Sequence, residues 1–192
     1  MNRAPALRIA AVAIAVAMLG GCVPAVVVGA AAGGAMVATD RRTTGTQVDD
    51  ESIELKVAHE AGQQYGDRIH LNVTSYNGIV LLTGEVPDQG VWASIGGMAK
   101  NTEKVRAVNN ELVVAPNTDL SSRSNDTYIT SKVKSRMIEA NRFPPNAVKV
   151  VTERGVVYLM GIVSMEEGNA AGETAATTSG VVRVVKFFQY RT

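Results

Sequence analysis

Apolar residues change their spacing along the second half of the chain, and each change marks a new element. Ile129, Val133, Met137 and Ala140 recur every three or four residues, which predicts a helix over 126–140 with this stripe buried. Runs rich in β-branched residues near 147–153 and 155–162 predict two strands joined by a tight turn. A second helix near 165–178 and a last strand at 181–190 complete the unit.

The same order of elements occurs about 77 residues earlier. In the strands, the matching residues are Val73, Gly78, Val80, Leu82, Gly84 and Val86 against Val150, Gly155, Val157, Leu159, Gly161 and Val163. In the preceding helix, where the offset is 76, they are Asp50, Ile53, Lys56 and Val57 against Asp126, Ile129, Lys132 and Val133. A repeat of this length indicates two similar domains rather than a solenoid. We expect the domains at 49–115 and 125–192, with a linker at 116–124.

The first copy is predicted to open with a helix at 49–62, with Asp50 as its N-cap. The buried stripe of this helix consists of Ile53, Val57 and Ala61. A hairpin at 68–84 follows, and its turn at Asn77-Gly78 is a strong tight-turn signal.

A helix that begins after Pro87 leads to a third strand at 105–114. Because a helix joins the second and third strands, these strands are expected to lie parallel in one sheet. The predicted fold class is therefore α+β. Each tandem domain has the order helix-strand-strand-helix-strand, with a three-stranded mixed sheet and two helices.

The N-terminus carries the pattern of an export signal. Arg3 and Arg8 precede an apolar run at 9–19, which is too short for a comfortable membrane span. The run ends in Leu19-Gly20-Gly21-Cys22, which resembles the bacterial lipobox, and Cys22 is the only cysteine. That resemblance implies a signal peptide at 1–21, a lipidated Cys22 and a tether and linker at 22–48. The alternative is a buried free cysteine in an ordinary signal or membrane helix.

The lipobox resemblance also implies a cellular location for the protein. The second residue of the mature protein would be Val23 rather than aspartate, which favours the outer membrane by resemblance to sorting in enteric bacteria. Diacylglycerol and an N-acyl chain on Cys22 would anchor the protein firmly, since one acyl chain alone binds a bilayer only marginally.

Charge is divided unevenly between the two copies, although the whole chain has a net charge of only +1. Residues 49–120 carry a net charge of −6, and residues 121–192 carry +4. Two interpretations are open: the copies have different partners, or the oppositely charged domains attract each other. Because the net charge of the whole chain is near zero, the composition does not indicate a nucleic-acid-binding protein.

Candidate chemistry is sparse. One cysteine permits no intramolecular disulfide, and two histidines alone cannot form a metal site, so we expect no metal and no cofactor. His59 and His70 are interpreted as ordinary surface or edge residues. Spacings such as Ser131 to Lys134 lack a supporting base, and no phosphate loop or HExxH motif is present. We therefore do not expect an enzyme.

The repeated order of elements, with Gly-Ile-Val-x-Leu-x-Gly at 78–84 and Gly-Val-Val-x-Leu-x-Gly at 155–161, resembles the BON domain. Two such domains behind a lipobox resemble the DolP family of outer-membrane lipoproteins. This resemblance implies a lipoprotein that faces the periplasm, supports outer-membrane integrity and gathers at the cell division site. It also implies links to the outer-membrane assembly machinery, and a second domain that binds anionic phospholipids through its first helix.

The residues of the helix at 126–140 can also be read without the family. At about 100° per residue, Tyr128, Lys132, Ser135 and Arg136 lie largely opposite the core stripe, flanked by Lys134 and Ile138. An exposed aromatic ring beside several cations is typical of a membrane-surface helix, although a solvated helix face remains the alternative. Tyr128 stands where the family carries a tryptophan. The candidate phospholipid-binding residues are Tyr128, Ile129, Lys132, Lys134, Ser135, Arg136 and Ile138.

The predicted lipid partners are phosphatidylglycerol and cardiolipin. The first domain is not expected to bind them, because Ser52 and Glu60 replace Tyr128 and Arg136 in its helix. A second function remains open, in which the chain is a protein-interaction adaptor for outer-membrane assembly or for regulators of cell-wall enzymes. Lipid contact would then be incidental.

Overall fold

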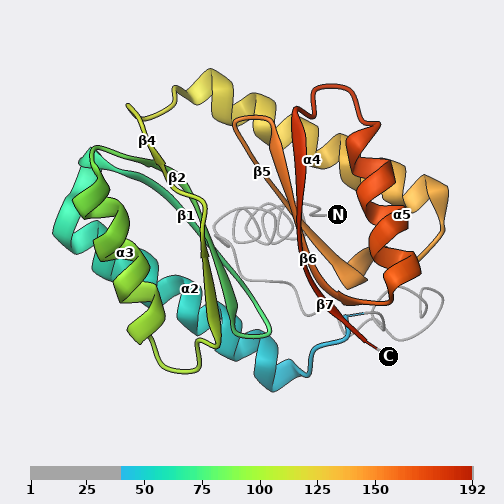
Figure 1. The fold of residues 1–192 in the computed structure, drawn as a ribbon, viewed down its shortest axis with the longest axis horizontal. Helices are drawn as coiled ribbons and strands as arrows, with labels where there is room; N and C mark the ends of the chain where they lie inside the picture. Colours follow the sequence, from blue (N-terminus) through green and yellow to red (C-terminus); the bar gives the residue numbers. More distant parts are fainter. Residues whose placement is uncertain (1–39, 192) are drawn as a thin grey trace, which may run out of the picture. The chain divides into compact units, whose positions relative to one another are not determined.

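The structure, a computed structural model, describes residues 40–191. The predicted signal peptide, the lipidation site at Cys22 and most of the predicted tether lie outside the described residues. Figure 1 shows two sheets, each with its own pair of helices.

The first half has the predicted order of elements. They are α2 (Thr44–Tyr65), η1 (Gly66–Arg68), β1 (His70–Tyr76), β2 (Ile79–Val86), α3 (Gln89–Asn101), β3 (Ala107–Asn110) and β4 (Val113–Val114). β1 pairs antiparallel with β2, and β2 pairs parallel with β3 and with β4. The sheet counts four strands instead of the predicted three because the last strand is interrupted after Asn110, whose side-chain oxygen accepts a hydrogen bond from the amide of Leu112.

The second half repeats this plan with an unbroken last strand. Its elements are α4 (Leu120–Ala140), η2 (Pro145–Ala147), β5 (Val148–Glu153), β6 (Val156–Val163), α5 (Met165–Ala176) and β7 (Arg183–Tyr190). The strand order is β5-β6-β7, with an antiparallel first pair and a parallel second pair. The predicted α+β class with tandem mixed sheets is confirmed.

Both opening helices begin earlier than predicted. α2 starts at Thr44, and the side chain of Thr43 caps it by accepting a hydrogen bond from the amide of Thr46. α4 starts at Leu120, within the predicted linker, and Asp119 caps it through the amide of Ser122. The predicted N-cap at Asp50 is therefore wrong, because Asp50 lies inside α2 and is 2% exposed.

Asp50 and its repeat partner Asp126 instead hold the two hairpin turns. Asp126 accepts hydrogen bonds of 2.8 Å from the amides of Arg154 and Gly155, and Asp50 accepts bonds of 2.7 and 2.8 Å from those of Asn77 and Gly78. All four turn residues have positive φ, as a type I′ turn requires. In such a turn both amides can point at one carboxylate. The buried aspartate thus ties each helix to its hairpin.

A second glycine of the repeated motif permits close contact between strands. A Cβ on Gly84 would lie 2.0 Å from the carbonyl oxygen of His70, and one on Gly161 would lie 2.3 Å from that of Ala147. Neither distance is possible for real atoms, so both positions require glycine. This explains why the last glycine of the motif recurs in both copies.

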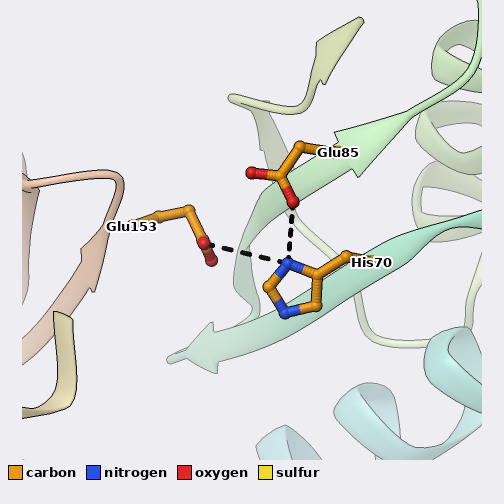
Figure 2. A group of neighbouring side chains, drawn as sticks. All are labelled: His70, Glu85 and Glu153. Carbon is orange, nitrogen blue, oxygen red and sulfur yellow. Dashed lines mark hydrogen bonds and ion pairs between the residues drawn. The ribbon is translucent and has the colours of Figure 1, made fainter. Parts of the chain in front are cut away.

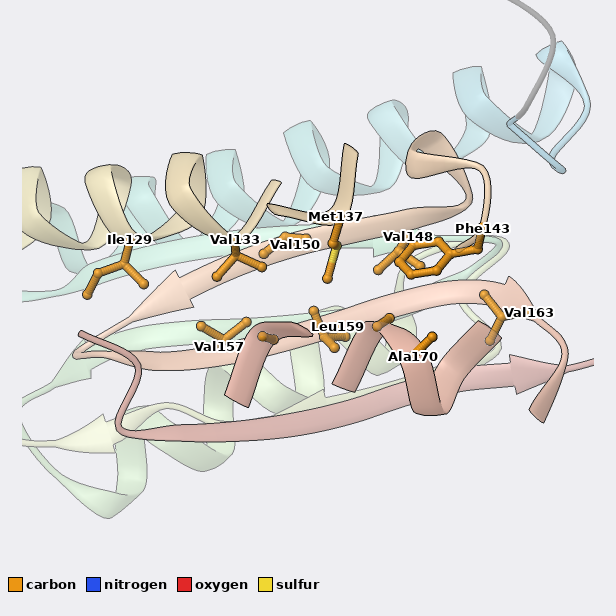
Figure 3. Close-up of a cluster of buried hydrophobic side chains, with 12 residues drawn as sticks. Ile129, Val133, Met137, Phe143, Val148, Val150, Val157, Leu159, Val163 and Ala170 are labelled. Carbon is orange, nitrogen blue, oxygen red and sulfur yellow. The ribbon is translucent and has the colours of Figure 1, made fainter. Parts of the chain in front are cut away.

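Each sheet has one face covered by its own helices. In the second half the helices α4 and α5 bury a cluster against β5 and β6 (Figure 3), in which Ile129, Val133 and Met137 line α4 as predicted. The first half buries the equivalent stripe of Ile53, Val57 and Ala61 against β2. The prediction was wrong for Ala140, which is exposed because α4 ends at this residue, beyond the buried stripe.

The opposite faces of the two sheets pack against each other. We call this contact the seam. Its buried apolar residues are Tyr76 and Leu81 from the first sheet and Tyr158 and Met160 from the second. Burial on both faces explains why the runs Ile79–Leu82 and Val156–Met160 are apolar without interruption. The two domains are recognisable separately, but they share this third cluster.

Polar contacts surround the seam. The ammonium of Lys149 lies 2.9 Å from a carboxylate oxygen of Glu54, and the side-chain nitrogen of Asn77 donates to the side-chain oxygen of Gln189 at 2.8 Å. In the first of these contacts an acid of the first domain meets a base of the second. The opposite net charges of the domains are therefore partly used in attraction between them.

Two arginines at the start of the described chain bind to both domains, and we call them the arginine clasp. Arg41 donates to both carboxylate oxygens of Glu167 and, at 2.6 Å, to the carbonyl oxygen of Ile162 in the second domain. Arg42 bonds to Asp50 at 2.8 Å and stacks 4.2 Å from the ring centre of Tyr76 in the first domain. The start of the described chain is thus fixed at the seam.

The clasp predicts a specific dependence of stability on pH. The hydrogen bonds from Arg41 lower the pKa of Glu167 from its ordinary 4.5 to about 2. Because the pKa is lower in the folded state, the ion pair stabilises the fold fully above about pH 4.5 and is lost as pH falls through about 2. We therefore expect the stability difference between the unmodified chain and Arg41→Gln to stay constant from pH 7 to 5 and to shrink between pH 4.5 and 2.

Urea unfolding at stepped pH values measures this difference. Arg191→Gln is the matched control, because Arg191 is more distant from Glu167, at 3.5 Å, and is half exposed. A stability difference for Arg41→Gln that stayed unchanged down to pH 2 would show that Glu167 does not carry the effect.

Candidate membrane-contact helix

The outer face of α4 exposes two large apolar side chains. Tyr128 is 62% exposed and Ile138 is 57% exposed, although both belong to a well-packed helix. Their neighbours in the sequence, Ile129 and Met137, are 1% exposed and lie in the core. The buried stripe fixes the rotation of the helix, so Tyr128 and Ile138 are held outward.

Ile129 was named among the candidate phospholipid-binding residues, but the structure does not bring it to this face. Its side chain packs in the core of the second domain, against the sheet. Ile129 therefore positions the helix and has no surface to offer a ligand. The other six candidates all have exposed or half-exposed side chains.

Two of the cations are held in place by the loop between α5 and β7. The ammonium of Lys132 donates to the carbonyl oxygen of Ser179 and lies 4.6 Å from the ring centre of Tyr128. The guanidinium of Arg136 donates to the hydroxyl of Thr178 at 3.0 Å. These contacts hold both side chains along one edge of the exposed face, with the aromatic ring beside them.

Lys134 and Ser135 are exposed, and Lys134 projects on the opposite edge from Arg136. The sequence interpretation missed Glu139 on the same face. Glu139 follows Tyr128 by 11 residues, which returns it to within about 20° of Tyr128 around the helix, and it is exposed. The helical periodicity that selected the cations would also have selected this acid. The face thus presents three cations and one carboxylate.

The equivalent face of α2 has a different character. Lys56, the counterpart of Lys132, lies 3.9 Å from Glu103, and Glu60 stands exposed in place of Arg136. Leu55 is 66% exposed, so an apolar group is present, but it has one paired lysine and one acid near it in place of the two cations of α4. The two helices form a natural comparison within one chain.

The two histidines differ from each other. His59 is exposed on α2, as expected. His70 is not an ordinary edge residue, because its side chain is only 12% exposed and its Nδ1 lies 2.9 Å from the fully buried Glu85. The pattern gave no sign of this contact, since the partner lies on the neighbouring strand.

Among the described helices, none has the length and apolar character needed to cross a bilayer.

The comparisons agree with the architecture. The BON domain family matches residues 49–116 and 125–192. Outer membrane lipoprotein DolP of Haemophilus influenzae is 43% identical over 99% of both chains. The 21 kDa hemolysin of Actinobacillus pleuropneumoniae is 35% identical over 79% of both. Osmotically-inducible protein Y of Escherichia coli is 29% identical over 80% of this chain and 78% of its own.

None of these three names is that of an enzyme. The family match covers both halves of the fold, and the similarity to DolP runs through almost the whole chain. With two repeats of the BON order of elements, each closed by the same glycine motif, the chain belongs to the BON-domain family as a DolP-like member with two BON domains.

Proposed function

We propose that this chain is an outer-membrane lipoprotein that binds anionic phospholipid through α4 and thereby supports the integrity of the outer membrane. Residues 1–21 serve as its signal peptide, Cys22 carries the lipid, and residues 22–48 tether two BON domains at 49–115 and 125–192. The similarity to DolP supports the location, and the exposed face of α4 supports the ligand.

One observation carries the lipid proposal: α4 holds Tyr128 and Ile138 outward beside Lys132, Lys134 and Arg136. A tyrosine ring favours the interface between water and lipid, and the aliphatic chain gains free energy when it leaves water. Each cation near an anionic surface contributes on the order of 1 kcal/mol. Together these groups support weak docking by a protein that a lipid anchor already holds at the membrane.

The test uses the whole mature chain with Cys22→Ser, in a soluble form without the anchor. Isolated domains are unsuitable, because each would expose the apolar sheet face that the seam buries. We expect binding to vesicles that contain phosphatidylglycerol or cardiolipin and not to neutral phosphatidylcholine vesicles. Binding should weaken as salt rises, because the Debye length falls from about 10 Å at 0.1 M to about 3 Å at 1 M.

Reversing two charges with Lys132→Glu and Arg136→Glu is expected to abolish binding. Two attractions of about 1 kcal/mol become two repulsions of similar size, a change of about 4 kcal/mol at low salt. Tyr128→Ala should weaken binding without a change in charge, and Glu139→Gln should strengthen it. Co-sedimentation with vesicles measures all of these variants.

The control is Lys56→Glu with Lys100→Glu, which changes the net charge equally on exposed residues of the first domain. This variant should bind nearly as well as the unmodified chain. Thermal unfolding checks that every variant is folded. If the α4 variants are folded and still bind anionic vesicles as the unmodified chain does, α4 is not the contact surface. The adaptor function, with partners in outer-membrane assembly or cell-wall remodelling, would then be favoured.

A further inference from the structure

Three side chains that can bind a metal meet at the edge of the seam. His70 on β1 and Glu85 on β2 are direct partners in the antiparallel register, and Glu153 ends β5 in the second domain. Figure 2 shows all three pointing into one space between the two sheets. One nitrogen or oxygen atom from each residue can be chosen so that all three atoms lie within 4.8 Å of one another.

The distances within the group are short. The Nδ1 atom of His70 lies 2.9 Å from Oε2 of Glu85 and 3.8 Å from Oε1 of Glu153. Four-coordinate zinc holds its nitrogen and oxygen ligands at about 2.0–2.2 Å, which places neighbouring ligands about 3.4 Å apart. Both distances from Nδ1 of His70 lie within about 0.5 Å of this spacing.

Both carboxylates are also held by neighbours outside the group. Oε2 of Glu85 accepts hydrogen bonds from the amide and the hydroxyl of Thr118, at 3.2 and 3.1 Å. Oε2 of Glu153 accepts one of 2.7 Å from Asn72. Such outer contacts orient ligands at metal sites and fix their geometry.

The second oxygen of Glu85 is the independent sign of a missing partner. Glu85 is 0% exposed, yet its Oε1 has no hydrogen-bond partner among the described residues. Leaving a charged oxygen buried without a hydrogen bond is costly, and native proteins rarely do so. In Figure 2 this oxygen is turned to the side on which Glu153 lies.

The charges of the group also favour a cation. Two buried carboxylates face one imidazole, and the nearest guanidinium, that of Arg154, lies 3.6 Å from Oε1 of Glu85 and is 43% exposed. Burial raises the pKa of Glu153. Burial also raises the pKa of Glu85, but hydrogen bonds from His70 and Thr118 outweigh it, so the pKa lies below its ordinary value.

We propose that His70, Glu85 and Glu153 bind a zinc ion that links the two domains across the seam. Nδ1 of His70, the carboxylate of Glu85 and Oε1 of Glu153 are the protein ligands, and water completes the tetrahedral set. The imidazole binds the ion through the lone pair of Nδ1 and carries its one proton on Nε2.

The test is a calorimetric titration of zinc chloride into the mature chain with Cys22→Ser. The chain is purified without a histidine tag and stripped with a chelator. We expect one ion per chain and a rise in melting temperature that the chelator reverses. His70→Gln and Glu153→Gln should each remove this binding, and Asn72→Ala should weaken it by about 10–100-fold through loss of an outer contact.

His59→Gln is the matched control, because His59 is the other histidine and is exposed on α2. This variant should bind zinc as the unmodified chain does. Melting curves in chelator check that the His70→Gln and Glu153→Gln variants are folded. If one of these variants is unfolded, zinc binding by the other variant tests the proposal. The proposal is overturned if the stripped chain binds no ion, or if a folded His70→Gln or Glu153→Gln variant binds zinc as well as His59→Gln.

Discussion

Replacing Asp126 with alanine is expected to lower the free energy of unfolding by about 3 kcal/mol. The substitution removes the acceptor of two backbone amides, those of Arg154 and Gly155, and a buried amide without a partner costs about 1–3 kcal/mol. Arg154 has a φ of 53°, a backbone conformation that residues other than glycine adopt only at some cost in free energy. Without the carboxylate, the hydrogen bonds that hold this conformation of the turn are lost.

Asp50→Ala should destabilise the protein further, because Asp50 also accepts bonds from Arg42 and from the hydroxyl of Ser75. Urea unfolding followed by circular dichroism gives both values. Thr127→Ala is the control, since Thr127 is exposed beside Asp126 on the same helix, and a change within about 0.5 kcal/mol is expected there. If Asp126→Ala lowered the free energy of unfolding by less than about 1 kcal/mol, the turn would not depend on its hydrogen bonds to the helix.

Replacing Cys22 with serine is expected to move the protein from the membrane fraction to the soluble fraction. A serine cannot form the thioether that carries diacylglycerol, so the chain would lose all its acyl chains. Each buried methylene contributes about 0.8 kcal/mol, which is far more over several chains than α4 can supply. Docking through α4 alone would then be weak and sensitive to salt.

Fractionation of cells and intact-mass analysis test this expectation together. The unmodified protein should carry the mass of a lipidated N-terminal cysteine, and the variant should not. Ser124→Ala is a control that changes an exposed side chain and should leave both the mass of the lipid and the fractionation unchanged. Mature protein with an unmodified Cys22 in the membrane fraction would rule out the anchor.

Periodicity and turn signals were sufficient to predict the architecture. The stripe of Ile129, Val133 and Met137 is buried as expected, and Asn77-Gly78 forms the tight turn that its residues favour. These signals are local, because burial of one helix face and positive φ at a glycine depend on nearby residues. The constant offset between matching residues added the information that the same arrangement of helices and strands occurs twice.

The helix starts could not be read from the same local signals. An aspartate before an apolar stripe usually caps a helix, and Asp50 was interpreted in this way. Its carboxylate instead reaches a turn 27 residues away. The sequence held a clue, since Asp50 and Asp126 recur at equivalent positions, but its meaning depends on a tertiary contact.

The candidate site was predicted better than the seam. Helical geometry alone placed Tyr128 and Ile138 outward, although it also passed over Glu139 on the same face. The contacts of His70 with Glu85 and Glu153 depend on strand register and on how two sheets meet, which no spacing along the chain reveals.

The seam also determines what a cut in the chain would do. The exposed segment between β4 and α4, residues 115–119, is the only covalent link along the backbone between the two domains. Cleavage by a protease at this segment would leave the contacts across the seam intact. These contacts are the shared apolar cluster, the ion pair of Lys149 with Glu54 and the ion pair of Arg41 with Glu167. The two fragments would stay associated as a non-covalent heterodimer. In that heterodimer each fragment would cover the apolar sheet face of the other and so prevent its aggregation.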